Sequence, residues 1–221
     1  ISSSPNLQKY RRLFDAFETD LNGGLGSDVH SMRRSALERF VESDFPTTRD
    51  EEWRFTNIAP IAAAEFVLPR VASLSDADRS SITSMCIDNA FRIVIVDGLV
   101  DDSLSNIEGL PAGVIYCSMR TALTSHTSVV HRALSRATIP LNNAFTFLNT
   151  AFLLDGVFLV VPESVVVERP FQMLFVATNS RNALLLQPRN LIVLEEQSQA
   201  TVAESYGSLG ESVYLRNAVT D

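Results

Sequence analysis

Apolar side chains in the first part of the chain recur at alternating spacings of three and four residues, the period of one face of an α-helix. The first set comprises Leu7, Tyr10, Phe14, Phe17 and Leu21, and a second set with similar spacing comprises Val29, Met32, Ala36 and Phe40. The pattern therefore predicts two consecutive amphipathic helices. Such a pair most often forms an antiparallel hairpin.

A short polar stretch follows the second predicted helix. Thr48 and Glu51 have the spacing of a capping box, in which each side chain accepts a hydrogen bond from the other residue's backbone N–H. The acids of Asp50–Glu52 also suit the positive end of a helix dipole. These acids have an alternative interpretation as an acid/base pair, but the capping interpretation explains them more simply. We predict a short acidic helical turn that carries the single tryptophan, Trp53.

Runs of β-branched and aliphatic residues become frequent from Phe91 onward. Phe91–Val96 is a strand candidate that ends in the tight-turn pair Asp97-Gly98, while Ser128–Ala137 and Asn142–Phe152 have helical patterns. After Val157, strand candidates follow one another without a helical segment; they are Val157–Val161, Val165–Val167, Phe171–Ala177, Leu191–Glu195, Ala200–Tyr206 and Val213–Val219. This order excludes an alternating βαβ fold and leaves a sandwich, a barrel or a stacked solenoid.

These changes of pattern divide the chain into three regions. Residues 1–88 form a helical region, residues 89–140 a mixed α/β connecting region, and residues 141–221 a β region.

Composition limits the possible partners. The chain has 221 residues, of which 46% are hydrophobic and 20% charged, as in ordinary folded proteins. Its formal net charge of −8 argues against nucleic acid and against anionic membrane surfaces, because both attract positively charged proteins. The only lysine is Lys9. No apolar run approaches the roughly 20 residues that span a bilayer, and no signal-peptide pattern is present.

The residue types that carry chemistry are few and scattered. His30, His126 and His131 lack the spacing of a helical metal pair, and Cys86 and Cys117 do not form a CxxC pair. We interpret both cysteines as reduced, partly buried thiols. The sequence contains no GxSxG, P-loop or GxGxxG pattern. We therefore predict no catalytic, cofactor-binding or metal-binding residue in this segment.

Five segments together carry a more specific pattern. They are residues 45–56 (FPTTRDEEWRFT), 91–98 (FRIVIVDG), 148–162 (LNTAFLLDGVFLVVP), 188–196 with 200–206 (PRNLIVLEE and ATVAESY), and 215–221 (LRNAVTD). In this order they resemble the SufD family, a component of the SUF (SufBCD) system for iron–sulfur cluster assembly. The related SufB family shares the β portion, but the Asp-Glu-Glu-Trp-Arg element favours SufD.

The resemblance implies an α+β fold in which an N-terminal helical region leads into the opening rungs of a right-handed parallel β-helix, mainly β after Val157. It also implies a longer chain, of which this sequence is the N-terminal portion, cut inside the β-helix. Residues 141–221 are then the truncated start of the β-helix core.

The implied function is that of a non-enzymatic scaffold subunit that pairs with SufB and with the ATPase SufC. In that arrangement ATP is bound by SufC, the cluster is handled by the whole complex, and this segment holds no cofactor. The family's residues for these contacts lie downstream, so none is assigned here, and we expect Trp53 and Arg54 to pack the N-terminal region together. The expected location is the cytoplasm, or alternatively the plastid stroma. The alternatives are a β-helix polysaccharide-active enzyme and a plain protein-interaction solenoid.

Overall fold

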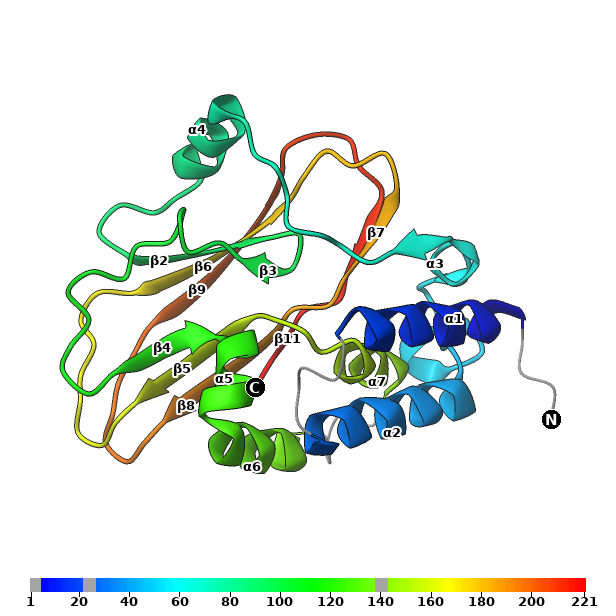
Figure 1. Cartoon of the computed structure of the whole chain (residues 1–221), viewed down its shortest axis with the longest axis horizontal. Coiled ribbons are helices and arrows are strands. Elements are labelled where there is room, and N and C mark those ends of the chain that lie inside the picture. Colours follow the sequence, from blue (N-terminus) through cyan, green and yellow to red (C-terminus); the bar gives the residue numbers. More distant parts are fainter. Residues whose placement is uncertain (1–4, 22–26, 138–142) are drawn as a thin grey trace.

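A computed structural model of the chain describes residues 5–21, 27–137 and 143–221 (Figure 1). The longest helices and most of the strands occupy different sides of the molecule, while three of the shorter helices pack on the strands. The longest helices, α1 (Pro5–Asp20) and α2 (Ser27–Ser43), lie with α7 (Ala144–Ala151) at one side, and most of the strands lie at the other (Figure 1). The structure is therefore α+β.

The two N-terminal helices confirm the helical pattern of the sequence. Their apolar faces are buried in one cluster with side chains of α7 and the residue after it, including Phe147 and Phe152. The buried residues of this cluster from α1 and α2 are Leu7, Tyr10, Phe14, Phe17, Ala36, Leu37 and Phe40. Arg33 is also fully buried, and its guanidinium donates to the carbonyl oxygen of Leu153 and lies 5.0 Å from the ring centre of Phe17. The helical side is thus joined to the chain that enters the sheets.

Shorter helices connect these parts. They are the 3₁₀ turn η1 (Glu51–Trp53), α3 (Ala59–Ala63), α4 (Asp76–Ser84), α5 (Met119–Ser125) and α6 (Thr127–Ala137). No helix in the described ranges has both the length and the apolar character needed to cross a membrane.

The strands form three sheets. The first has the order β3-β2-β6-β9, formed by Leu99–Val100, Phe91–Val96, Phe171–Ala177 and Val202–Ser208. The second has the order β11-β8-β5-β4, formed by Val219–Thr220, Arg189–Leu194, Val157–Val161 and Ile115–Ser118. The third has the order β1-β7-β10, formed by Phe66–Val67, Ala183–Leu186 and Tyr214–Arg216.

The expected right-handed parallel β-helix is wrong. The three sheets are open, and none of them closes or forms a solenoid among the described strands. Two of the sheets are mixed, because β3 pairs antiparallel with β2 and β4 pairs antiparallel with β5. Strands β1 to β4, which precede Val157, contribute to every sheet, so the β structure is not confined to the later part of the chain. Apolar runs locate strands, but they do not specify the partner or the direction of pairing.

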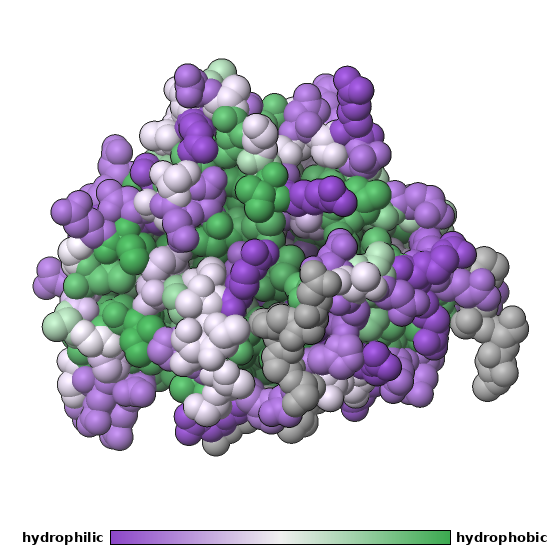
Figure 2. Space-filling model, viewed as in Figure 1, coloured by the Kyte–Doolittle hydropathy of each residue, from purple (hydrophilic) through white to green (hydrophobic). Residues whose placement is uncertain are grey.

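The central strands β2, β5 and β6 of the first two sheets have long apolar runs because both of their faces are covered. Alternate residues of β2, β5 and β6 share one core, which includes Ile93, Leu159 and Met173. The opposite face of β2 and β6 packs against α4 through Ile82, and the opposite face of β5 packs against α5 and α6. Figure 2 shows hydrophilic residues around the outline of the molecule and hydrophobic residues between them on the strand-rich side.

The predicted capping box between Thr48 and Glu51 is also wrong. The turn is closed one residue earlier, where Asp50 Oδ2 accepts hydrogen bonds from the backbone nitrogen of Thr47 at 2.6 Å and from its hydroxyl at 3.1 Å. These hydrogen bonds lower the pKa of Asp50. Both threonines have the same side chain, so the sequence does not show which of them is used.

Trp53 packs as expected, and Arg54 does not. The indole of Trp53 stacks on Phe145 at 5.2 Å and joins the cluster of the helical side. Arg54 is exposed and lies over the ring of Phe55, which is itself 92% exposed.

The only lysine of the chain has a structural contact. Lys9 Nζ on α1 donates hydrogen bonds to the carbonyl oxygens of Ala62 and Ala64, each at 2.6 Å. These carbonyls lie at the end of α3, where a cation is favourable for the helix dipole. Lys9 therefore connects α1 to the segment that follows α3.

Candidate ligand-binding site

Polar side chains from three of the family-like segments, together with Gln187 beside one of them, meet in a largely buried cluster, which we call the polar junction. It consists of Asn149, Gln187, Arg189, Asn190, Asn217 and Asp221. Arg189 is 1% exposed, and its Nε donates to Asp221 Oδ2 at 2.6 Å. Its Nη1 lies 3.3 Å from both Asn149 Oδ1 and the hydroxyl of Thr150 on α7. Burial lowers the pKa of Arg189, and the charge of Asp221 opposes this shift. The pair therefore ties α7 to the second sheet.

Amide side chains extend the junction to the backbone. Asn149 Nδ2 donates to the carbonyl oxygens of Pro188 at 3.0 Å and Asn217 at 2.8 Å. Asn217 Nδ2 donates to the carbonyl oxygen of Phe145 and to Gln187 Oε1, both at 2.7 Å. These amides pair backbone groups that water would otherwise have to satisfy.

The turn Asp155-Gly156 lies beside the polar junction and is organised by a buried carboxylate. Asp155 is 5% exposed and accepts hydrogen bonds from the backbone nitrogens of Val100 at 3.0 Å, Arg120 at 3.3 Å and Gly156 at 2.9 Å. Burial raises the pKa of Asp155, while these hydrogen bonds and the charge of Arg120 oppose the increase. One side chain thus fixes the start of β3, the start of α5 and its own turn.

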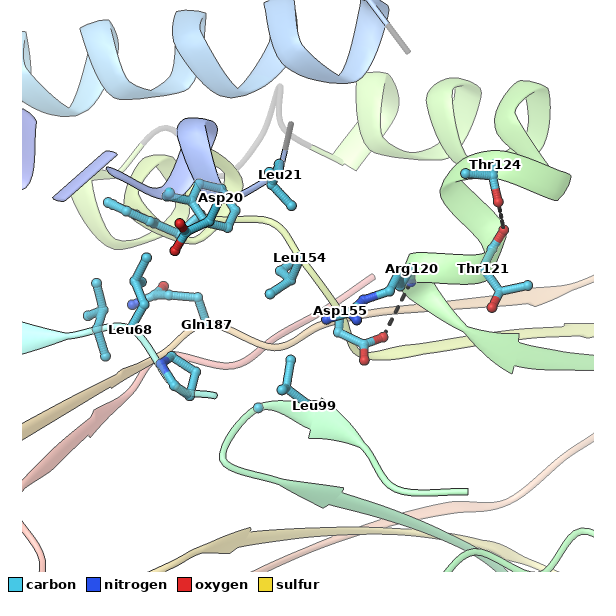
Figure 3. A pocket seen from close by; sticks show the side chains of 15 residues that line it. Asp20, Leu21, Leu68, Leu99, Arg120, Thr121, Thr124, Leu154, Asp155 and Gln187 are labelled. Carbon is cyan, nitrogen blue, oxygen red and sulfur yellow. Dashed lines mark hydrogen bonds between the residues drawn. The ribbon is translucent and has the colours of Figure 1, made fainter. Parts of the chain in front are cut away.

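A cavity of about 510 Å³ opens between this turn, the end of α1, β3 and α5 (Figure 3). Its volume falls in the range of small-molecule sites. Most of the wall is apolar and includes Phe17, Leu21, Leu68, Leu99, Phe152, Leu154 and Leu185. The polar groups lie toward different ends: Asp155, Arg120 and the threonines of α5 on one side, and Asp20 and Gln187 on the other (Figure 3).

Gln187 belongs to both the polar junction and the cavity wall. It is 6% exposed, and its Oε1 accepts the hydrogen bond from Asn217. Its Nε2 has no hydrogen-bond partner among the residues that the structure describes. A buried donor without a partner is costly, so this nitrogen is an unpaired group of the polar junction.

The scattered histidines and cysteines stay apart in the structure. His30 pairs with Glu18 of α1, His126 stacks on Phe158 at 5.2 Å, and His131 is exposed on α6. Cys86 and Cys117 are free and partly buried, which confirms their interpretation, and burial raises the pKa of Cys117. Within the described ranges, no three or more His, Cys, Asp or Glu side chains are grouped so that they could hold a metal ion.

The sequence did not single out Gln187 or Arg120, although each lies close to a recognisable signal. Gln187 directly precedes the segment Pro188–Glu196, and Arg120 follows the strand that ends at Ser118. Glutamine and arginine are common residue types and give no signal by themselves. Only the fold places these two residues around one cavity.

Comparisons with known proteins identify relatives of the chain. Residues 4–173 match the family model described as the SufBD protein N-terminal region. The chain is 29% identical over 212 residues to an iron–sulfur cluster assembly SufBD family protein of Synechocystis, covering 91% of this chain and 46% of that protein. It is 28% identical over 182 residues to the iron–sulfur cluster assembly protein SufD of Bacillus subtilis, covering 80% and 41%. It is 24% identical over 221 residues to the chloroplastic protein ABCI7 of Arabidopsis thaliana, covering 95% and 45%. The chain thus spans about half the length of the curated relatives it matches.

Proposed function

The chain belongs to the SufBD family, and from this premise we propose that it acts in iron–sulfur cluster assembly as a scaffold subunit. The observation that carries the proposal is the match over residues 4–173, which covers the helical side and the strands up to β6. The Synechocystis and Bacillus relatives are named as iron–sulfur cluster assembly proteins, and these names support the same proposed role.

The proposed partners are SufB and the ATPase SufC, and the proposed role is non-enzymatic. SufC would hydrolyse ATP, while this protein would hold the assembly in shape. The polar junction supports such a role, because its buried hydrogen bonds join α7 to the β8 and β11 strands and so fix the helical side to the second sheet. The cytoplasm is the proposed location, with the plastid stroma as the alternative.

Co-purification tests the partners. The tagged protein is co-expressed with the SufB and SufC encoded in the same genome, and we expect both to be captured in a constant ratio through affinity and sizing columns. A tagged but unrelated acidic protein of similar size is the control. Capture of neither partner by a protein whose circular dichroism shows native helix and strand would overturn the partner assignment.

A genetic test addresses the role itself. A strain that lacks the gene should lose activity of an iron–sulfur enzyme such as aconitase, while an enzyme without a cluster keeps its activity. Reintroducing the gene should restore the lost activity. Unchanged aconitase activity under iron limitation and oxidative stress would contradict a role in cluster assembly.

A further inference from the structure

The most exposed large apolar side chain among the described residues belongs to Phe55, which lies between η1 and α3. It is 92% exposed, whereas the other twelve of the thirteen phenylalanines are buried or partly buried. The guanidinium of Arg54 lies 5.2 Å from the centre of its ring but covers little of it. Single exposed apolar side chains are ordinary on protein surfaces, so exposure alone gives Phe55 no role.

The backbone on both sides of Phe55 is fixed by the rest of the fold. The nitrogen of Trp53 donates to the carbonyl oxygen of Asp50, and the nitrogen of Thr56 donates to that of Trp53, each at 2.9 Å. Trp53 packs against the buried cluster of the helical side, and Ile58 belongs to that cluster. Phe55 therefore stands on a short turn whose two ends are held by the core. Because such a turn is already ordered, binding it costs little further conformational entropy, as expected for an interface anchor.

Acidic side chains precede Phe55 and lie on the same exposed turn. Residues 42–54 contain five acids and two arginines, which give a formal charge of −3. Asp50, Glu51 and Glu52 are exposed, and no ion pair in the described part of the chain involves them. These charges would repel an anionic lipid surface, whereas they would attract a protein surface that has arginine or lysine around an apolar pocket.

We propose that residues 50–56, which we call the Phe55 turn, anchor a protein partner by placing Phe55 in an apolar pocket that basic side chains border. The SufB–SufC assembly is the partner to which we assign this contact. The inference rests on the proposed function, because a scaffold subunit needs a surface on which its partners dock. Phe55 supplies the apolar contact, and the carboxylates of Glu51 and Glu52 face the basic border of the pocket.

Biolayer interferometry of the tagged protein, expressed from its whole gene, against purified SufB–SufC measures this contact. We expect Phe55→Ala to weaken binding at least about tenfold, as for an interface hot spot, and Phe55→Tyr, which keeps the ring, to weaken it less than about threefold. Val71→Ala is the matched control, because Val71 is also apolar and is 84% exposed. It should leave the affinity unchanged.

Salt tests the charged part of the contact. A double variant, Glu51→Gln with Glu52→Gln, should bind more weakly than the wild type at low salt, and its affinity should depend less on salt. Tighter binding by the double variant would contradict a basic border around the pocket.

The urea midpoint of Phe55→Ala should equal that of the wild type, because the side chain is exposed, so that loss of binding is not loss of structure. Equal binding of SufB–SufC by the wild type and by Phe55→Ala would overturn this inference and leave the proposed function intact. Absence of binding by the wild type would overturn both. Vesicles of phosphatidylcholine and phosphatidylglycerol and a sizing column test the other occupants. Flotation or self-association that Phe55→Ala abolishes would assign the turn to a membrane or to a second copy, and would also overturn the inference.

Discussion

Replacing Gly156 with alanine tests the contact between the Asp155-Gly156 turn and β8. The backbone of Gly156 has a φ of 144°, a conformation that residues with a side chain rarely adopt. A Cβ at this position would lie 2.6 Å from the carbonyl carbon and 2.8 Å from the nitrogen of Arg189, and closer still to its carbonyl oxygen. Because these atoms belong to the backbone, rotation of a side chain cannot relieve the overlap.

The cost follows from the three effects that the new methyl group would have. Leaving the glycine conformation costs about 1–2 kcal/mol, and overpacking adds about 1–3 kcal/mol. A shift of β8 would also strain the hydrogen bonds from Arg189 to the carbonyl of Asp155, at 3.0 Å, and from Val157 to Asn190, at 3.1 Å. We therefore expect the free energy of unfolding to fall by about 3–5 kcal/mol, a large part of the total stability of a typical domain.

Urea unfolding followed by the fluorescence of Trp53 measures this change, because the single tryptophan stacks on Phe145 in the folded core. Gly109→Ala is the matched control. Gly109 also has a positive φ, of 83°, but the nearest atom to a new Cβ is the end of the Arg169 side chain at 3.7 Å. The control should lose only about 1 kcal/mol. Equal urea midpoints for the two variants would refute the steric argument.

Three further changes test the buried polar contacts. Arg189→Lys keeps a charge near Asp221 but loses the bonds to α7, so we expect a loss of about 2–3 kcal/mol in the same urea titration; an unchanged midpoint would contradict this. Because burial raises the pKa of Asp155, the folded chain holds that proton more tightly than the unfolded chain. The stability advantage of the wild type over Asp155→Asn should be largest near pH 4 and shrink toward pH 7, whereas a constant difference would rule out this linkage. Lys9→Met removes two hydrogen bonds to the end of α3 and should lower Tm by about 2–8 °C in a calorimetric scan; an equal Tm would show that Lys9 adds no stability.

Hydrophobic periodicity predicted the helices, because their buried faces are set by residues that lie close together in the sequence. The faces of α1 and α2 could be read from the sequence because Phe14 and Phe17 follow the helical period and are buried together. The threonine that pairs with Asp50 before Trp53 could not, because Thr47 and Thr48 have the same side chain and only the folded turn brings Thr47 to Asp50.

Sheet topology depends on contacts that the sequence does not display. Strand β5 has an apolar run that is easily recognised, yet its neighbours β4 and β8 lie far from it in the chain. Strand β4 runs antiparallel to β5, whereas β8 runs parallel to it. An apolar run shows that a strand is buried, but it does not show which strands pair with it or whether they run parallel to it. The β-helix was inferred from resemblance, and the antiparallel pairs and open sheets contradict it.

The polar residues of the family-like segments have a structural explanation that the sequence could not provide. Asn149, Arg189 and Asn217 suggest chemistry in isolation, but each is engaged by a backbone group or by another residue of the polar junction.

Two nitrogens of the junction stay unpaired within the described residues: the hydrogen bond from Asn217, 30 residues away, occupies only the oxygen of the Gln187 amide, and Arg189 Nη2 has no partner. Paired and unpaired groups thus arise in the same network, because the geometry that pairs most donors of the junction leaves these two without an acceptor. The residues that make the segments recognisable are therefore explained by the contacts through which they join α7 to the second sheet.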